Sequence, residues 1–301
     1  MISADRPDWM REQERSHALF LKLMVWISLT FGRRLGRVVL RGIALYFVLF
    51  APRARRASRG YLARALGRYA NWRDGYLHVL SFASTIHDRV YLLNDRFDAF
   101  DIEVHGAEAL DEVLRQKTGT LLVGAHLGSF EVLRAMGRDR AGLRVAMLMY
   151  EQNARKLNAT LAAINPKALQ DIIPLGRLES MLEVRDKLDA GYVVGMMADR
   201  SLGGDAMQEA QFLGQSAAFP VGPWRLAVML RRPVFFMTGL YLGGNRYSLH
   251  FEPLADFSDV GRGERDAAIA VAVQRYADCL TRYCRQAPYN WFNFFDFWQK
   301  K

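Results

Sequence analysis

The pattern of apolar and polar positions changes near residue 100. Before this point the chain holds long apolar runs with arginines between them, and after it short β-rich runs alternate with helical stretches. Alternation of strands and helices predicts a largely parallel sheet with helices on both faces. The sequence therefore predicts an α/β fold, preceded by an N-terminal helical region of a different character.

Seven segments after residue 99 have the length and composition of strands. They are Phe100–His105, Thr120–Ala125, Leu143–Met149, Gln170–Pro174, Tyr192–Ala198, Pro233–Leu242 and Tyr247–Glu252. Helices are expected at Ala107–Gln116, Ser129–Gly137, Arg155–Ile164, Leu178–Ala190, Val221–Leu230 and Glu264–Arg285. Gly243-Gly244-Asn245 is a hairpin turn between the last two strands, so we expect a mixed sheet with an antiparallel pair at one edge.

Two apolar stretches, Ala18–Phe31 and Ile43–Ala51, dominate the N-terminal region. Each is shorter than the ~20 apolar residues that a membrane-spanning helix requires. Arg33, Arg37 and Arg41 lie between them at intervals of four and share one helical face. The pattern favours two amphipathic helices lying in one leaflet, with these arginines among lipid phosphates. A single tilted span is the competing interpretation.

The net charge of the chain is +10 and lies entirely in residues 1–68, which hold 14 Lys and Arg against 4 Asp and Glu; the remainder holds 27 of each. A nucleic-acid-binding domain usually spreads positive charge over a folded face, whereas this charge adjoins the most apolar segments. We therefore expect an anionic membrane surface as a partner and no nucleic acid. We assign residues 1–70 to a membrane-associated region and residues 71–301 to an α/β domain, with the arginines on the cytoplasmic side.

Cysteine and aromatic residues add two smaller expectations. Cys279 and Cys284 lie about 140° apart on a predicted helix, so we expect two reduced thiols and no shared metal. The tail from Pro288 to Trp298 contains seven aromatic residues. They either fill the core or line a membrane edge or an acyl channel.

The most informative stretch is AHLGSFE, in which His126 directly follows a predicted buried strand. In open parallel sheets, functional groups gather at the carboxyl ends of strands. Gly128 would let the loop turn, so that Glu131 could accept a hydrogen bond from one nitrogen of His126 and leave the other free as a base. Ser129 suits a helix N-cap better than a nucleophile, because no G-x-S-x-G elbow surrounds it. A capping and packing role for the His126–Glu131 pair is the alternative.

The sequence resembles the glycerolipid acyltransferase superfamily, and in particular its lipid A late-acyltransferase branch. Five elements in order carry the resemblance over residues 10–298: the apolar basic beginning, HLGSFE, the Gly191–Asp199 stretch, F-L-G with FPVGPWRLA up to Ala227, and P-Y-N-W-F at Pro288–Phe292. Enzymes of this branch move an acyl chain from a thioester, usually on acyl carrier protein, to a hydroxyl of a lipid or sugar-lipid acceptor. The resemblance implies the same reaction here at the cytoplasmic face of a bacterial inner membrane, with acyl carrier protein or coenzyme A as donor and no cofactor or metal.

The resemblance also assigns residues to roles. It implies that His126 is the general base and Glu131 its partner, and that Asp199 and Arg200 form a polar pair near the acyl and acceptor groups. Phe219 and Gly222 belong to the loop that is expected to close the cleft, and Asn153 to a Y-R-x-x-N element. In that element this chain reads Tyr-Glu-Gln-Asn, so a glutamate replaces the expected cation.

That departure points away from lipid A itself as the acceptor. The whole chain more closely resembles the relatives that accompany aryl-polyene or similar lipid-linked pigment pathways. Two other functions stay open from sequence: a catalytically silent membrane-peripheral scaffold of the same fold, and a thioester or lipid hydrolase in which water replaces the alcohol.

Overall fold

A seven-stranded mixed sheet is the centre of the computed structural model, which describes residues 18–116, 118–133, 143–150, 171–175, 178–201 and 204–299. Its strands are β1 (Asp101–His105), β2 (Thr120–Gly124), β3 (Val145–Tyr150), β4 (Asp171–Leu175), β5 (Val193–Met197), β8 (Pro233–Gly243) and β9 (Arg246–Asp256). Their spatial order is β1-β9-β8-β2-β5-β3-β4. The strands from β8 to β4 are parallel, while β9 is antiparallel to β8 and parallel to β1. The predicted mixed sheet and its β8–β9 hairpin are confirmed, but β1 and not the hairpin forms that edge of the sheet.

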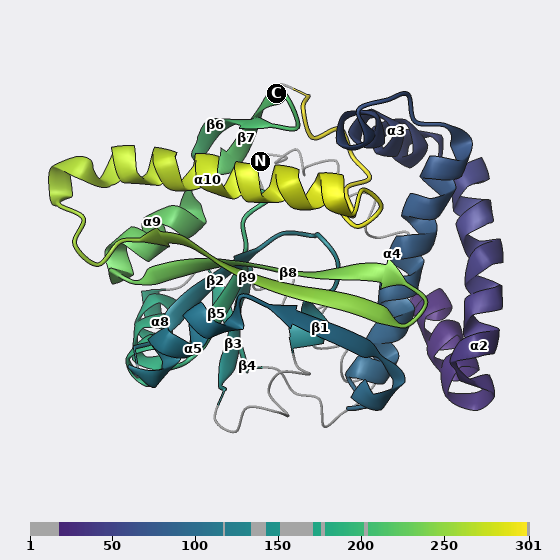
Figure 1. Ribbon diagram of the computed structural model, residues 1–301, viewed down its shortest axis with the longest axis horizontal. Coiled ribbons are helices and arrows are strands. Elements are labelled where there is room, and N and C mark those ends of the chain that lie inside the picture. The colour runs from purple at the N-terminus through teal and green to yellow at the C-terminus, as the bar shows by residue number, and fades with distance from the viewer. Residues whose placement is uncertain are drawn as a thin grey trace, which may run out of the picture.

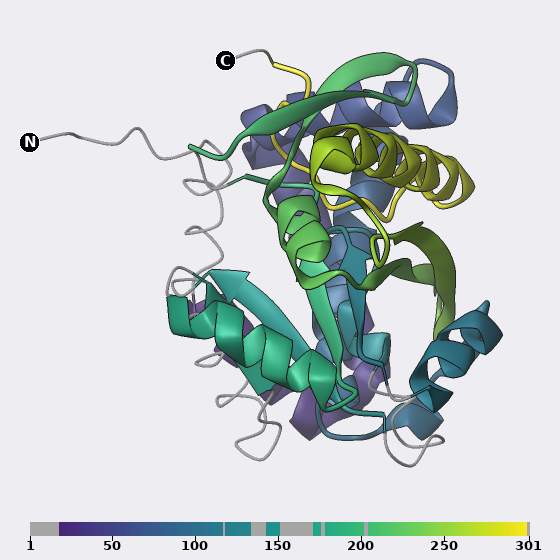
Figure 2. The ribbon, with the colours of Figure 1, turned by 90° about the vertical axis from the view of Figure 1, so that its left-hand side faces the viewer.

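Two hydrophobic layers sandwich the sheet because successive side chains of a strand point to opposite faces. In β2, Leu121 and Val123 pack in one core, and Leu122 packs in the other. The first core includes α8 (Leu178–Asp189), α9 (Gly222–Leu230) and α10 (Arg265–Gln286), and the second includes α5 (Ala107–Arg115). Figure 2 shows α5 and α8 on opposite sides of the central strands. These four helices match the sequence prediction.

Two predicted helices fall largely outside the described residues. Of Ser129–Gly137, the structure describes a 3₁₀ turn, η2 (Phe130–Val132), and Leu133. Arg155–Ile164 lies wholly outside the described residues, as does Asn153.

A two-stranded hairpin that the sequence did not predict precedes α9. It consists of β6 (Met207–Phe212) and β7 (Gln215–Pro220), and a turn with positive φ at Leu213 and Gly214 joins them. Polar residues such as Gln208 and Gln211 interrupt its apolar positions, which weakens the strand signal. Its apolar side is nevertheless buried, because Phe212 and Phe219 pack against Trp291 or Tyr276.

The N-terminal helices form a layer beside the β8–β9 turn (Figure 1). They are α2 (Ala18–Phe50), which is interrupted at Gly32, α3 (Pro52–Leu66) and α4 (Trp72–Leu92). The sequence analysis did not predict α4, which an Asn71–Asp74 capping box begins. Tyr61 and Leu62 of α3 are fully buried in the same core as the sheet. Helix α3 therefore contributes side chains to the same core as the sheet, and the boundary at residue 70 stays a prediction.

Two of the arginines assigned to lipid phosphates have a different place. Arg33 Nε lies 2.9 Å from Asp88 Oδ1, and Arg37 Nη2 lies 2.6 Å from Asp88 Oδ2. Both guanidinium groups also donate to the carbonyl oxygen of Gly244, in the β8–β9 turn. The lipid-facing prediction is wrong for this pair, because a fully buried carboxylate on α4 needs positive partners more strongly than the membrane surface does. Arg41, one turn further on, is exposed.

No single helix of the described chain is long and apolar enough to cross a membrane. Gly32–Phe50 and Pro52–Leu66 pass the length and composition test only together, and they meet at a bend of 97°.

The two cysteines are free and buried, as predicted. The aromatic tail fills the core at Trp291, which is fully buried against Tyr61, Phe212 and Phe297.

Replacing Asp88 by alanine tests whether the buried pair holds the N-terminal layer. We expect the free energy of unfolding to fall by about 2–4 kcal/mol, less than for a wholly buried pair because both arginines keep some contact with water. Urea denaturation followed by tryptophan fluorescence measures the change. Asp98→Ala, at an exposed position of the turn after α4, is the control. Equal stability of the two variants would contradict a structural role for Asp88.

Candidate active site

The loop after β2 is held between two other segments of the chain. On one side, the Ser129 N–H donates to the Gly239 carbonyl of β8 at 2.8 Å. On the other, the Phe292 N–H donates to the His126 carbonyl at 2.8 Å, and the Gly128 N–H donates to the Asn290 carbonyl at 2.9 Å. The P-Y-N-W-F motif therefore fixes the histidine loop through backbone hydrogen bonds and an isolated antiparallel bridge between Leu127 and Trp291.

Gly128 is required for this arrangement. Its φ is +74°, in the left-handed region that other residues rarely adopt, and a Cβ at this position would collide with the Gly239 carbonyl oxygen. The backbone freedom predicted for Gly128 is confirmed. Asn290 adds a second tie, since its side-chain amide exchanges two hydrogen bonds with the backbone of Tyr241 in β8.

His126 forms its side-chain hydrogen bond with Asp199. The Nδ1 atom of His126 lies 2.8 Å from Asp199 Oδ1, and the backbone N–H of His126 donates to Asp199 Oδ2 at 3.1 Å. Trp291 Nε1 donates to the same oxygen at 3.1 Å. Asp199 is two residues past the end of β5, which is the parallel neighbour of β2. The two side chains meet because parallel strands end at the same edge of a sheet.

The electrostatics of this pair fix the tautomer of the ring. Burial alone would raise the pKa of Asp199, but the attraction of His126 and Arg200 and the hydrogen bonds from His126 hold it well below its usual range. An ionised Asp199 only accepts, so Nδ1 carries the proton and Nε2 is left with its lone pair. Burial and the charge of Arg200 lower the pKa of His126, Asp199 opposes them, and Arg89 adds a smaller lowering. The ring is therefore neutral at pH 7 and has the form of a general base.

Arg200 lies beside the pair but is turned towards the C-terminal segment. Its Nη2 donates to the Phe292 carbonyl at 2.6 Å, its Nε lies 3.9 Å from Asp199 Oδ2, and its guanidinium stacks over the Phe295 ring. The Asp199–Arg200 pair predicted from the sequence is present. It supports the histidine, and Asp199 takes the orienting position that the sequence analysis gave to Glu131.

Glu131 is buried and has other partners. Its Oε1 lies 2.6 Å from Nε of Arg89 on α4, and its Oε2 accepts from the Ser129 hydroxyl at 3.1 Å. The predicted Glu131–His126 hydrogen bond is therefore wrong. Asp199 occupies the hydrogen-bonding position at Nδ1, and the short 3₁₀ turn directs Glu131 towards α4. Ser129 occupies the N-cap position of that turn without a side-chain capping bond. Its buried hydroxyl hydrogen is directed to a carboxylate.

Phe219 and Gly222, which the sequence analysis assigned to the loop that closes the cleft, lie in β7 and at the start of α9. Phe219 is fully buried, and its ring is edge-on to Tyr276, whose hydroxyl donates to the Gly124 carbonyl at 2.9 Å. Gly222 is the first residue of α9, with open space where a Cβ would lie. The substrate-binding role of both residues stays a prediction.

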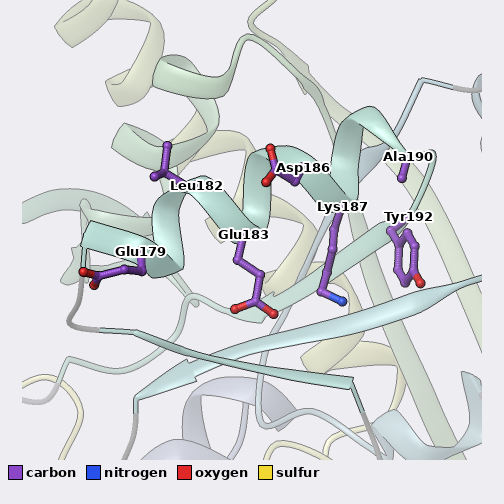
Figure 3. A pocket seen from close by; sticks show the side chains of 7 residues that line it. All are labelled: Glu179, Leu182, Glu183, Asp186, Lys187, Ala190 and Tyr192. Atoms are coloured by element: carbon purple, nitrogen blue, oxygen red, sulfur yellow. The ribbon is translucent and has the colours of Figure 1, made fainter.

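A measured hollow of about 490 Å³ lies elsewhere, along α8 (Figure 3). Its lining includes Glu183, Asp186, Lys187 and Tyr192, which precede the amino end of β5. None of its seven lining residues belongs to the loop after β2 or to the Asp199–Arg200 pair. No cluster of three or more potential metal ligands occurs among the residues that the structure describes.

Sequence reasoning missed Arg89 and Trp291 as neighbours of the site. Both come from segments far from the histidine loop in the chain, and no local pattern signals such contacts. The sequence did contain a signal for the Asp199–His126 contact, because each is the first titratable residue after its strand, and the two strands, β2 and β5, are neighbours.

Titration of the ring tests the electrostatic assignment. We expect His126 to titrate below the ordinary histidine value of about 6.5, so that the neutral form is lost only as the pH falls through the lowered pKa. Asp199→Asn removes an opposing effect and should lower the pKa of His126 further. NMR of ¹³C-labelled histidine measures both, with the signal assigned by its absence in His126→Ala. A midpoint above 6.5 in the parent protein would contradict the assignment.

Comparisons with known proteins identify the family of the chain. The search of curated proteins found no match to the chain. Residues 9–300 match the family model of the bacterial lipid A biosynthesis acyltransferases. The match covers all but the ends of the chain, and its range includes His126, Asp199 and the P-Y-N-W-F motif. The chain therefore belongs to the bacterial lipid A biosynthesis acyltransferase family.

Proposed function

We propose that the protein is an O-acyltransferase that moves a fatty acyl chain from a thioester to a hydroxyl of a lipid or glycolipid at a membrane surface. Membership of the family gives the coarser activity, acyl transfer in lipid biosynthesis. One observation carries the rest: a neutral histidine whose Nδ1 is bound to a buried carboxylate at 2.8 Å, at the carboxyl ends of adjacent parallel strands. This is a base with its orienting group and no activated protein nucleophile.

The reaction is a direct transfer in this proposal. Nε2 of His126 takes the proton of the acceptor hydroxyl while that oxygen attacks the thioester carbonyl carbon. The tetrahedral intermediate collapses, the C–S bond breaks, and the imidazolium returns its proton to the leaving thiolate. Asp199 holds the ring and stabilises the imidazolium that forms. Because a thiolate leaves readily, alignment of the two substrates contributes most of the rate enhancement.

The donor is a thioester of acyl carrier protein or coenzyme A, and neither requires a cofactor or a metal in this step. Acyl carrier proteins are acidic, so the exposed arginines of α3 would speed their encounter with the protein. Arg53, Arg56 and Arg59 are exposed there.

The same region supports placement on a membrane. Tyr46, Leu49 and Phe50 share one face at the end of α2 and are 57%, 56% and 69% exposed. The exposed Arg53 and Arg56 follow within two turns, after the bend. Apolar side chains beside arginines are suited to an interface of acyl chains and anionic headgroups. We propose the cytoplasmic leaflet of the bacterial inner membrane as that surface.

Replacing His126 by alanine tests the chemistry. Loss of a general base should reduce acyl transfer by about 10²–10⁴-fold. His105→Ala, at an exposed histidine of β1, is the matched control and should keep full activity. Mass spectrometry of lipids from a deletion strain, complemented with each variant, identifies the acceptor. Thioester cleavage independent of any alcohol would favour a hydrolase, and a parent protein without turnover on either donor would favour the scaffold.

Removing the exposed apolar face of α2 tests the membrane placement. Tyr46→Ser, Leu49→Ser and Phe50→Ser together should weaken binding to vesicles by at least ~100-fold, because each buried side chain contributes about 2 kcal/mol. Co-sedimentation with vesicles of anionic and neutral phospholipids measures it. Val271→Ser, which changes an exposed apolar residue of α10, is the control. Unchanged binding of the triple variant would place the membrane contact elsewhere.

A further inference from the structure

Arg89 is the accessible cation beside the histidine. Its side chain is 26% exposed, whereas that of Arg200 is 9% exposed and donates to the Phe292 carbonyl. The charges of both guanidinium groups lower the pKa of His126, and Arg89 contacts Glu131 of the histidine loop. Of these two described cations, the more accessible one therefore comes from α4, a helix that the sequence did not connect with the chemistry.

Glu131 accounts for the position of Arg89. Its carboxylate is 8% exposed, and its Oε1 lies 2.6 Å from Nε of Arg89. The other oxygen accepts from Ser129. Glu131 therefore fixes one edge of the guanidinium, and Ser129 fixes Glu131. The five-residue step from His126 to Glu131 places a base and a held arginine on one short loop.

The geometry leaves donors of Arg89 for another group. A guanidinium has five N–H donors, and one carboxylate oxygen at Nε occupies a single edge. In the described part of the chain, Glu131 is the one side chain paired with Arg89. Arginine N–H pairs match the oxygens of phosphate, which they bind in a bidentate manner.

We infer that Arg89, positioned by Glu131, binds a phosphate oxygen of a substrate next to His126. The inference rests on the proposed acyl transfer, since it gives the site a way to align one substrate with its base. The phosphate has two sources in that reaction: the phosphopantetheine arm of the donor and the headgroup of a phosphorylated lipid acceptor. Both present the same chemistry to Arg89.

Anion binding can be measured without turnover. Inorganic phosphate is titrated against the full-length protein while the ¹³C-labelled ring of His126 is followed by NMR. A bound anion next to the ring favours the imidazolium, so phosphate should raise the pKa of His126 and shift its signal at constant pH. Sulfate and chloride at equal ionic strength separate binding from general screening. Absence of a saturable shift in the parent protein would overturn the inference.

Variants then assign the effect to Arg89. Arg89→Met alone would leave Glu131 buried without its cation, so the double variant Arg89→Met/Glu131→Gln is used to keep the pair neutral. We expect it to bind phosphate at least tenfold more weakly. Glu131→Gln alone should weaken binding less, because the arginine is present but no longer held. Arg89→Lys should restore part of the affinity.

Arg73→Met is the matched control. It removes one positive charge from the same helix at an exposed position 16 residues earlier, about 24 Å along the helix axis. Its phosphate affinity should stay within twofold of that of the parent protein. Equal loss in the Arg73 and Arg89 variants would mean general electrostatic attraction and would overturn a specific site.

Two substrate pairs identify the source of the phosphate. Acyl-phosphopantetheine and acyl-pantetheine differ by a phosphate on the donor, and lysophosphatidic acid and monoacylglycerol differ by a phosphate on the acceptor. The parent protein should show a higher KM for whichever phosphate-free substrate lacks the bound group, and the double variant should no longer distinguish that pair. Indifference of the parent protein to both pairs overturns the inference. Saturable phosphate binding without any acyl transfer would instead refute the proposed function and leave the anion site standing.

Discussion

The buried carboxylate of Asp199 is the point on which the site depends. It accepts hydrogen bonds from the His126 ring, the His126 backbone and the Trp291 indole, and it lies next to Arg200. An isolated carboxylate in this position would be costly, and these donors make it stable as an anion. In return it joins the end of β5, the loop after β2 and the C-terminal segment. The hydrogen bonds that stabilise the buried charge of Asp199 therefore also orient the His126 ring.

Helix α4 connects the N-terminal layer with this site through adjacent residues. Asp88 binds Arg33 and Arg37 of α2, while Arg89 binds Glu131 of the histidine loop. Consecutive helical residues point about 100° apart, so one turn of α4 can contact both layers. A displacement of α2 would act on Asp88, which is adjacent in α4 to the Arg89 that contacts the histidine loop. The contacts that fix α2 and those that fix the histidine loop therefore share one turn of α4.

The sequence was sufficient for the sheet and insufficient for the pairing of charges. Short apolar, β-rich runs located all seven central strands within a few residues, because strands that are covered on both faces need apolar side chains at most positions. It missed the β6–β7 hairpin, whose burial comes from aromatic contacts with the distant Trp291 and Tyr276. His126 was found because it follows β2 directly. Its partner was misassigned because proximity in sequence suggested Glu131, whereas the parallel register of β2 and β5 brings Asp199 closer.

The arginines of the N-terminal region also show that sequence spacing does not predict which charges will pair. A spacing of four residues places Arg33, Arg37 and Arg41 on one face, but it cannot tell which charges that face will meet. The fold presents a buried aspartate to the first two and solvent to the third. At the active site the balance is finer: the cations Arg200 and Arg89 lower the pKa of His126 while Asp199 raises it. Each cation is itself paired with a carboxylate, so the ring stays neutral without a large net charge around it.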